Sequence, residues 1–135
     1  MTQSSSFLPQ LGSFKEAFPE AAKATSVPVK IRTLDGMKDE IAIQDSLLVK
    51  IDTQGFEDKV ISGGRVTIRR ARVAIIEVSF VPLYDGQPLF SDIYETMKSL
   101  GHTFAGVLDV MRDPRTSMVL QADAVFIGGN VDQDV

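Results

Sequence analysis

One stretch of the chain, residues 47–57 (LLVKIDTQGFE), constrains the fold more than any other. It begins with apolar residues interrupted only by Lys50, and it continues through Asp52 into a turn that contains glycine. A short apolar run bounded by turn-forming residues predicts a β-strand buried on both faces, as in the parallel sheets of α/β proteins. Ligands of such sheets bind at the carboxyl ends of the strands. We therefore expect the strand from Leu47 to Ile51 to end at a functional edge.

The residues after this stretch predict a helix and then a second buried strand. Residues 56–68 have the composition of a helix, with acidic side chains in the first turn, where negative charge is favourable. The pair Gly63-Gly64 lies in its middle, and glycine in a helix interior costs about 1 kcal/mol relative to alanine. We therefore expect a break or a close contact there. Residues 73–80 (VAIIEVSF) are almost wholly apolar and predict a buried strand with Glu77 near its carboxyl end.

The C-terminal part of the chain predicts one more helix and two strands. An apolar stripe of Ile93, Met97 and Leu100 indicates a helix that ends at the glycine after it. Residues 102–111 and 119–127 predict strands, and the polar turn between them favours an antiparallel hairpin. The alternation of strands and helices predicts an α/β fold whose sheet is mostly parallel, with a C-terminal antiparallel hairpin strand.

The N-terminal part carries weaker patterns. Residues 25–33 alternate valine and isoleucine with basic residues, which predicts a half-buried strand, and Pro28 favours an edge position. Residues 34–43 predict a short helix with Asp35 as its N-cap. No period is sustained over residues 1–24, which we interpret as a loosely ordered arm whose aromatic side chains contact a partner surface.

Composition narrows the classes of function. The chain has 135 residues, of which 44% are hydrophobic and 24% charged, as in a single soluble globular domain. A net charge of −4 gives the molecule as a whole no attraction to nucleic acid or to an anionic membrane. The sequence has no cysteine, which excludes disulfides, thiolate metal sites and cysteine nucleophiles. It also lacks a bilayer-spanning apolar run and a secretion-signal pattern, so we expect a cytoplasmic protein.

The segment KIDTQGFE at residues 50–57 resembles the K-I-D-x-x-G-x-E signature of the FkbM-type methyltransferases, S-adenosylmethionine-dependent enzymes that mostly methylate oxygen. Similar segments follow in the family's order: TLD at 33–35, GG at 63–64, IIEVSF at 75–80, PLYDGQPLF at 82–90 and QADAVFI at 121–127. The resemblance implies part of a class I methyltransferase (Rossmann-like) fold and S-adenosylmethionine as cofactor. It also implies a small-molecule substrate that bears a hydroxyl group, of the sugar or natural-product type.

The sequence departs from this family at its N-terminal side. A whole enzyme of this type begins with a strand, a glycine-rich G-x-G turn and a second strand that ends in an acidic residue. No G-x-G pattern occurs here, and the glycine pairs at 63–64 and 128–129 follow a helical segment or end the chain, so neither pair is placed to bind a cofactor. The resemblance therefore implies that residues 25–130 form the C-terminal half of the domain. The cofactor-binding half is then absent from this chain, with residues 1–24 an arm and 131–135 a tail.

Two carboxylates are the candidate catalytic residues. Asp52 follows the first buried strand, where it could steer a substrate or accept the proton of its hydroxyl group during methyl transfer. The alternative is that it caps the following turn through backbone amides. Glu77 lies in an otherwise apolar strand, where an unpaired charge is unfavourable. Its carboxylate must either reach the functional edge of the sheet or pair with a cation such as Lys50.

Four further residues are candidates for the lining of a substrate or cofactor cleft: Gln54, Gly55, Glu57 and Ser79. Glu57 has an alternative role, because a glutamate in the first turn of a helix commonly interacts with the helix dipole. The only histidine, His102, follows a helix stop, so we expect it to be exposed and not catalytic. No combination of residues indicates a metal site.

Two interpretations of function follow. The first is a methyltransferase in which this chain carries the substrate side of the cleft and the cofactor-binding half is missing. The second is a non-catalytic remnant or interaction module that keeps the sheet. In both, the strand from Leu47 to Ile51 lacks a neighbour on one side, and an exposed apolar edge favours pairing with another chain. We therefore expect self-association through this strand, and no nucleic-acid or membrane partner.

Overall fold

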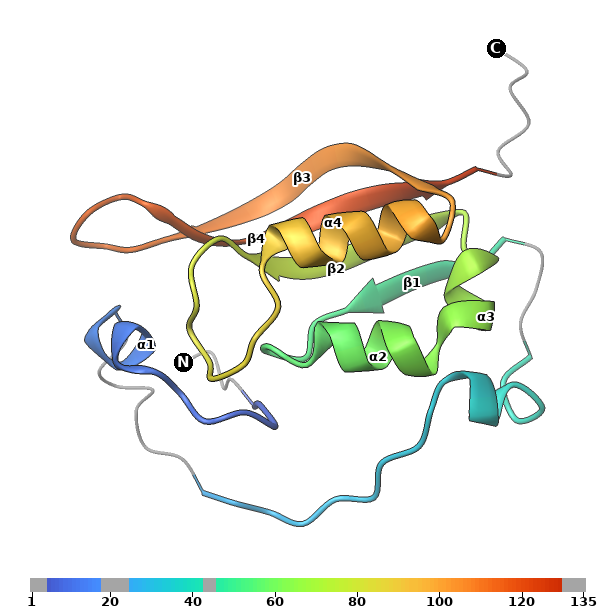
Figure 1. The fold of residues 1–135 in the computed structure, drawn as a ribbon, viewed down its shortest axis with the longest axis horizontal. Coiled ribbons are helices and arrows are strands. Elements are labelled where there is room, and N and C mark those ends of the chain that lie inside the picture. The colour runs from blue at the N-terminus through green and yellow to red at the C-terminus, as the bar shows by residue number, and fades with distance from the viewer. Residues whose placement is uncertain (1–4, 18–24, 43–45, 130–135) are drawn as a thin grey trace.

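The structure, a computed structural model, describes residues 5–17, 25–42 and 46–129 (Figure 1). Parts of the predicted arm (1–4 and 18–24) and the predicted tail (131–135) lie outside these residues. None of the helices in the described ranges is long and apolar enough to cross a membrane. The elements follow in the order α1 (Gly12–Ala17), the 3₁₀ turn η2 (Asp35–Met37), β1 (Leu48–Ile51), α2 (Glu57–Gly63), α3 (Arg65–Arg69), β2 (Val73–Ser79), α4 (Phe90–Ser99), β3 (His102–Arg112) and β4 (Val119–Gly128).

The four strands form one mixed sheet in the order β1-β2-β4-β3. β1 and β2 are parallel, whereas β4 is antiparallel to both of its neighbours, β2 and β3. The prediction of an α/β fold with a C-terminal antiparallel hairpin strand is confirmed. The expectation of a mostly parallel sheet is wrong for the pairing of neighbouring strands, although β1, β2 and β3 run the same way. Only one neighbouring pair in the described sheet is parallel, since β4 lies between β2 and β3.

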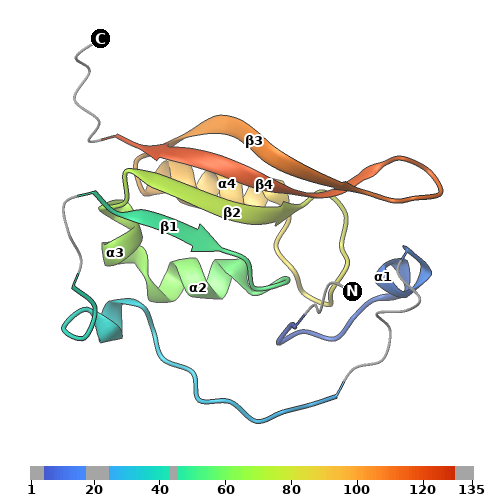
Figure 2. The same ribbon diagram turned by 180° about the vertical axis from the view of Figure 1, so that it is seen from behind.

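All three helices that follow β1 cover the same face of the sheet. Figure 2 shows the strands from the side opposite to α4, with the helix behind them. On the covered face, Ile76 of β2 and Phe126 of β4 pack with Ile61 of α2, Ile68 of α3 and Met97 of α4 in one buried core. These side chains alternate along each strand with those of the other face, as the pleat requires. The covered face therefore holds the main hydrophobic core.

The other face of β1 and β2 has no helix over it in the described structure, so the prediction of strands buried on both faces is wrong. Leu48 is 58% exposed, and Ile75 is only partly buried. An apolar run reveals that a strand can be buried on two sides, but not whether the described chain supplies a second layer. The polar residues of the candidate site lie on this uncovered face.

The helical region after β1 breaks at the glycine pair, as predicted. α2 ends at Gly63 and α3 begins at Arg65. A side chain at Gly64 would come within 3.0 Å of Leu34, because the η2 segment packs closely against this point. The break therefore permits a close contact between two segments that are distant in sequence.

The predicted helix over residues 34–43 is wrong. Only the short turn η2 forms there, and residues 43–45 lie outside the described part. Asp35 does not cap its own helix. Its carboxylate accepts hydrogen bonds from the backbone N–H groups of Val66 (3.0 Å) and Thr67 (2.9 Å), in the first turn of α3. Asp35 thus satisfies free amides at the start of a helix 31 residues away in the chain.

The predicted strand over residues 25–33 is also wrong. The segment is irregular, and its alternating apolar residues Val27, Val29 and Ile31 are 70%, 60% and 65% exposed. In both views it runs apart from the sheet, below α2 (Figures 1 and 2). A strand forms only by pairing with a neighbour, and no described strand lies beside this segment.

His102 is buried, not exposed as expected. It begins β3 and is only 4% exposed. Its Nε2 lies 3.2 Å from the carbonyl oxygen of Ala71. Burial lowers the pKa of the imidazole below its ordinary value. His102 is buried because Gly101, with φ of +88°, ends the helical segment and turns the chain directly into the sheet. The next residue, His102, therefore enters the packed interior.

β1 forms one edge of the sheet, and no described strand pairs with its outer side. We expect the chain to self-associate through this edge, because unpaired N–H and C=O groups beside an exposed apolar side chain favour strand pairing. Light scattering at tens of micromolar should detect a dimer or a larger species. Leu48→Lys, which places a charge on the edge, should return the chain to the monomer. Val66→Lys on α3, at a similarly exposed position, is the control and should not.

A monodisperse monomer with a cooperative melt would show that this edge is not an association surface. Equal effects of the two lysine substitutions would assign self-association to general surface hydrophobicity and not to β1.

Candidate functional site

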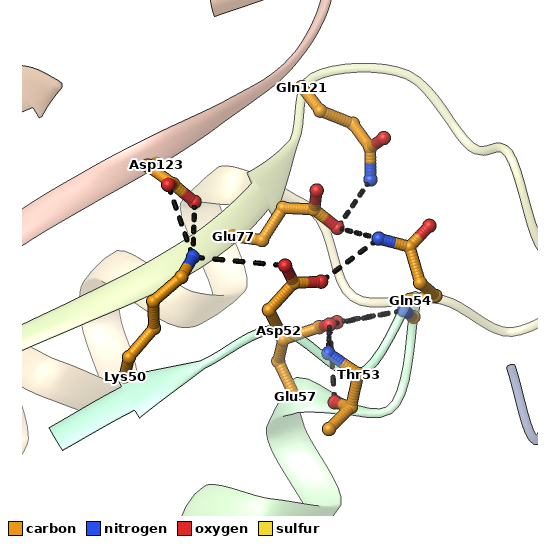
Figure 3. A network of polar contacts seen from close by, with 9 residues as sticks. Lys50, Asp52, Thr53, Gln54, Glu57, Glu77, Gln121 and Asp123 are labelled. Atoms are coloured by element: carbon orange, nitrogen blue, oxygen red, sulfur yellow. Dashed lines mark hydrogen bonds and ion pairs between the residues drawn. The ribbon is translucent and has the colours of Figure 1, made fainter. Parts of the chain in front are cut away.

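Polar side chains gather where β1 and β2 end, on the sheet face that the helices leave uncovered (Figure 3). Lys50 lies on β1, Glu77 on β2 and Asp123 on β4. Glu77 and Asp123 are register partners across the β2–β4 ladder. Because residues 76, 78, 122 and 124 face the core, the intervening residues must face the opposite side. The pleat therefore brings charges from three strands to one place.

Asp52 and Glu77, the two predicted catalytic residues, are linked by one amide group. The Nε2 of Gln54 donates a hydrogen bond to Oδ1 of Asp52 (3.0 Å) and another to Oε2 of Glu77 (2.6 Å). Asp52 is the more accessible of the two, with 42% of its side chain exposed. Glu77 lies deeper, where its Oε2 also accepts a hydrogen bond from Nε2 of Gln121 (3.0 Å).

Gln54 is held at several points. Its φ of +53° lies in the left-handed region, which is uncommon for a residue other than glycine. The hydroxyl group of Tyr84 donates to its Oε1 (2.9 Å), and the hydroxyl group of Ser6 donates to its backbone carbonyl (2.5 Å). The loop before α4 and the N-terminal segment therefore both contact the turn after β1.

Glu57 closes the turn after β1. It is 2% exposed, and its carboxylate accepts hydrogen bonds from the backbone N–H groups of Thr53 (2.9 Å) and Gly55 (3.0 Å). Gly55 has φ of +100°, and a side chain there would approach Tyr84 to 3.3 Å. The backbone amides of the turn thus bond to Glu57, whereas the contacts found for Asp52 are with the side chains of Gln54 and Lys50.

Ser79 lies in a second branch of the same network. It is fully buried, and its hydroxyl oxygen accepts hydrogen bonds from Nε2 of Gln87 (2.6 Å) and Nε2 of Gln121 (3.2 Å). The Oε1 of Gln87 in turn accepts the backbone N–H groups of Leu83 and Tyr84. Ser79 therefore connects the end of β2 to the loop that positions the Tyr84 hydroxyl.

The surroundings of Glu77 favour its neutral form. Burial raises the pKa of Glu77 to about 8, and the carboxylates of Asp52, Glu57 and Asp123 act in the same direction. Lys50 acts in the opposite direction, but it does not form the expected ion pair with Glu77. Its Nζ lies 3.1 Å from Asp123 and 3.7 Å from Asp52. The positive charge of Lys50 therefore balances the carboxylates of Asp52 and Asp123, whereas the carboxyl group of Glu77 retains its proton near neutral pH.

Burial, followed by the carboxyl groups of Glu77, Glu57 and Asp52, raises the pKa of Tyr84 to about 12, so its hydroxyl group is a hydrogen-bond donor at neutral pH. The site thus combines an accessible carboxylate, Asp52, with a protonated one, Glu77. An accessible carboxylate beside a carboxyl group whose pKa is raised by burial is suited to proton transfer. Within the described ranges, no cluster of three or more histidine or acidic residues is arranged to bind a metal ion.

The structure brings together three of the predicted residues, Asp52, Gln54 and Glu77. The sequence patterns did not mark the residues that form hydrogen bonds or ion pairs around them. Gln121 and Asp123 occur two apart in a strand that is otherwise apolar, and this spacing was a usable signal that both point to one face. No local pattern marked Gln87 or the Tyr84 hydroxyl, because their partners lie elsewhere in the chain.

Comparisons with known proteins agree on one kind of domain. A family model described as the methyltransferase FkbM domain matches residues 2–104. The 2-O-methyltransferase NoeI of Sinorhizobium fredii (strain NBRC 101917 / NGR234) is 36% identical over 61 residues, which cover 45% of this chain. The match covers 25% of NoeI, so the chain corresponds to about a quarter of that relative. No solved structure matches significantly. Asp52, Gln54 and Glu77 lie within the residues matched by the family model, whereas β4 lies beyond them.

Proposed function

The chain belongs to the FkbM methyltransferase family, and from this premise we propose that it carries the substrate side of an S-adenosylmethionine-dependent O-methyltransferase. Support for oxygen as the methyl acceptor comes from the name of its relative NoeI, a 2-O-methyltransferase. We further propose that the substrate is a small molecule with a hydroxyl group, of the sugar or natural-product type. The architecture proposed for the whole domain is the Rossmann-like sheet of class I methyltransferases.

The observation that carries this proposal is the pair of carboxyl groups bridged by Gln54 at the ends of β1 and β2. Asp52 is accessible and lies beside Lys50. In the proposed reaction its carboxylate accepts the proton of the substrate hydroxyl, which leaves the oxygen as the nucleophile for the methyl group. Glu77, protonated near neutral pH, donates or accepts a hydrogen bond at the same substrate without adding a second negative charge.

The described residues do not fit a complete cofactor site. S-adenosylmethionine would supply the methyl group, but a site for it in this type of sheet requires a glycine-rich turn after a strand. Here Gly63 and Gly64 pack against Thr33 and Leu34, and a side chain at Gly128 would collide with the carbonyl oxygen of Ala71. These glycines serve packing. We therefore assign no cofactor contact to them and propose that cofactor-binding elements lie outside this chain.

The alternative is an interaction module that keeps the sheet without catalysis. It is favoured because no strand in the described part of the chain pairs with the outer side of β1, and such an edge strand can receive a strand from another chain. The two proposals differ in what they require of Asp52 and Glu77. A methyltransferase needs both carboxyl groups to act on a substrate, whereas an interaction module does not.

A chimera separates the two proposals. The region of NoeI that matches this chain is replaced by the corresponding residues of this chain. Methyl transfer from tritiated S-adenosylmethionine to the acceptor molecule of NoeI is then measured. We expect the chimera to bind S-adenosylmethionine and to transfer methyl groups. The isolated chain, titrated calorimetrically, should give no saturable heat at sub-millimolar ligand. A folded chimera that binds the cofactor but transfers nothing would favour the interaction module. Micromolar binding by the isolated chain would show that it holds a cofactor site of its own.

A further inference from the structure

The side chain of Gln54 has only one orientation that satisfies all its neighbours. The carboxylate of Asp52 accepts hydrogen bonds, and Oε2 of Glu77 already accepts one from Nε2 of Gln121, so the oxygens that face Gln54 act as acceptors. The amide nitrogen must therefore face Asp52 and Glu77, and both of its N–H bonds are used there. The amide oxygen then faces Tyr84, whose hydroxyl group donates to it. A rotated amide would place its oxygen against two carboxyl groups and its nitrogen against the tyrosine.

The backbone of Gln54 supports the same conclusion. A left-handed conformation is unfavourable at a residue other than glycine and persists where surrounding contacts hold it. Here the contacts come from two directions, because Ser6 bonds to the backbone carbonyl and Tyr84 to the side chain. Strained residues held in this way cluster at functional sites.

We propose that Tyr84 and Gln54 are positioning residues: the tyrosine hydroxyl orients the amide of Gln54, which aims its two N–H bonds at the carboxyl groups of Asp52 and Glu77. The positioning itself follows from the geometry, whereas its consequence for catalysis rests on the proposed function. Tyr84 acts only through Gln54 and needs no contact with a substrate.

The arrangement also determines which oxygen of Glu77 carries the proton. Oε2 accepts two N–H groups, from Gln54 and Gln121. An oxygen that accepts two hydrogen bonds is the poorer place for a proton, so the proton resides on Oε1. The charged groups that act on this carboxyl group are Asp52, Glu57, Asp123 and Lys50.

The test measures the pKa of the Glu77 carboxyl group by ¹³C NMR, with its signal assigned by its loss in Glu77→Gln. Tyr84→Phe keeps the buried ring and removes the hydroxyl, so the amide of Gln54 is free to rotate and donates less well to ionised Glu77. We expect the measured pKa to rise by about 0.5 or more, the equivalent of one weakened hydrogen bond. Gln54→Asn withdraws the amide while tolerating the left-handed backbone, and it should raise the pKa further.

Tyr94→Phe is the matched control, because Tyr94 lies on α4 and packs against aromatic rings. It should leave the pKa of Glu77 unchanged. An unchanged pKa in both Tyr84→Phe and Gln54→Asn would overturn the proposal, and a rise in Gln54→Asn alone would remove Tyr84 from it. These measurements need no methyl transfer. An inactive chimera with the expected pKa changes would thus contradict the proposed function while leaving the positioning intact.

Discussion

Asp52→Asn in the NoeI chimera is expected to lower turnover at least about tenfold, because a general base contributes about 10²–10⁴-fold to the rate. The amide keeps the shape of the carboxylate but cannot accept the proton of a hydroxyl group. The melting temperature should stay within a few degrees. The turn amides after β1 bond to Glu57 and not to Asp52, and the 3.7 Å ion pair with Lys50 is exposed and contributes little.

The matched control is Asp58→Asn. Asp58 lies in the first turn of α2 and pairs with Lys59 at 2.8 Å, outside the carboxylate network. Its replacement should leave turnover unchanged. An Asp52 variant that retains turnover but loses stability would assign Asp52 a structural role in the turn and would remove it from the proposed reaction.

The second large effect concerns stability and pH. The pKa of Glu77 is raised to about 8 in the folded chain, from 4.5 for a free glutamate. Between these values the folded state holds a proton that the unfolded state has lost, so stability must fall as pH rises through this range. Glu77→Gln mimics the protonated form at every pH. It should therefore match the wild type near pH 4.5 and exceed it above pH 8.

Above pH 8, we expect the unfolding free energy of Glu77→Gln to exceed that of the wild type by ~2 kcal/mol. Each pKa unit corresponds to about 1.4 kcal/mol, and the partial exposure of Glu77 reduces the full effect. Urea unfolding across this pH range, at concentrations too low for self-association, measures it. Glu95→Gln on the exposed side of α4 is the control and should not alter the pH dependence. Equal pH dependence in Glu77→Gln and the wild type would show that Glu77 is ionised throughout.

Local patterns in the sequence predicted the elements that depend on neighbouring residues. The strand before Asp52, the strand around Glu77, the helix break at Gly63-Gly64 and the C-terminal hairpin all form close to their predicted positions. Each rests on an apolar run, a backbone preference or a turn, and these act over a few residues. The same signals placed Asp52, Gln54 and Glu77 at the ends of two neighbouring strands.

Local patterns failed where a segment needs a partner from elsewhere in the chain. The alternation in residues 25–33 is that of a strand, but a strand without a neighbour cannot form its ladder of hydrogen bonds. Asp35 has the chemistry of a helix cap, yet the helix that it caps is α3. His102 follows a helix stop, as exposed residues often do, but the turn at Gly101 carries it into the interior.

The sequence alone determined the strands and helices from residue 47 onward and the family of the chain, because both are recorded in short contiguous segments. Only the tertiary structure decided which carboxyl group is accessible and which is protonated. Those properties depend on the burial of Glu77, on the preference of Lys50 for Asp123, and on the contact of Gln54 with Tyr84 across 30 residues of chain. Burial and electrostatic interaction depend on distances in space, which no local pattern specifies.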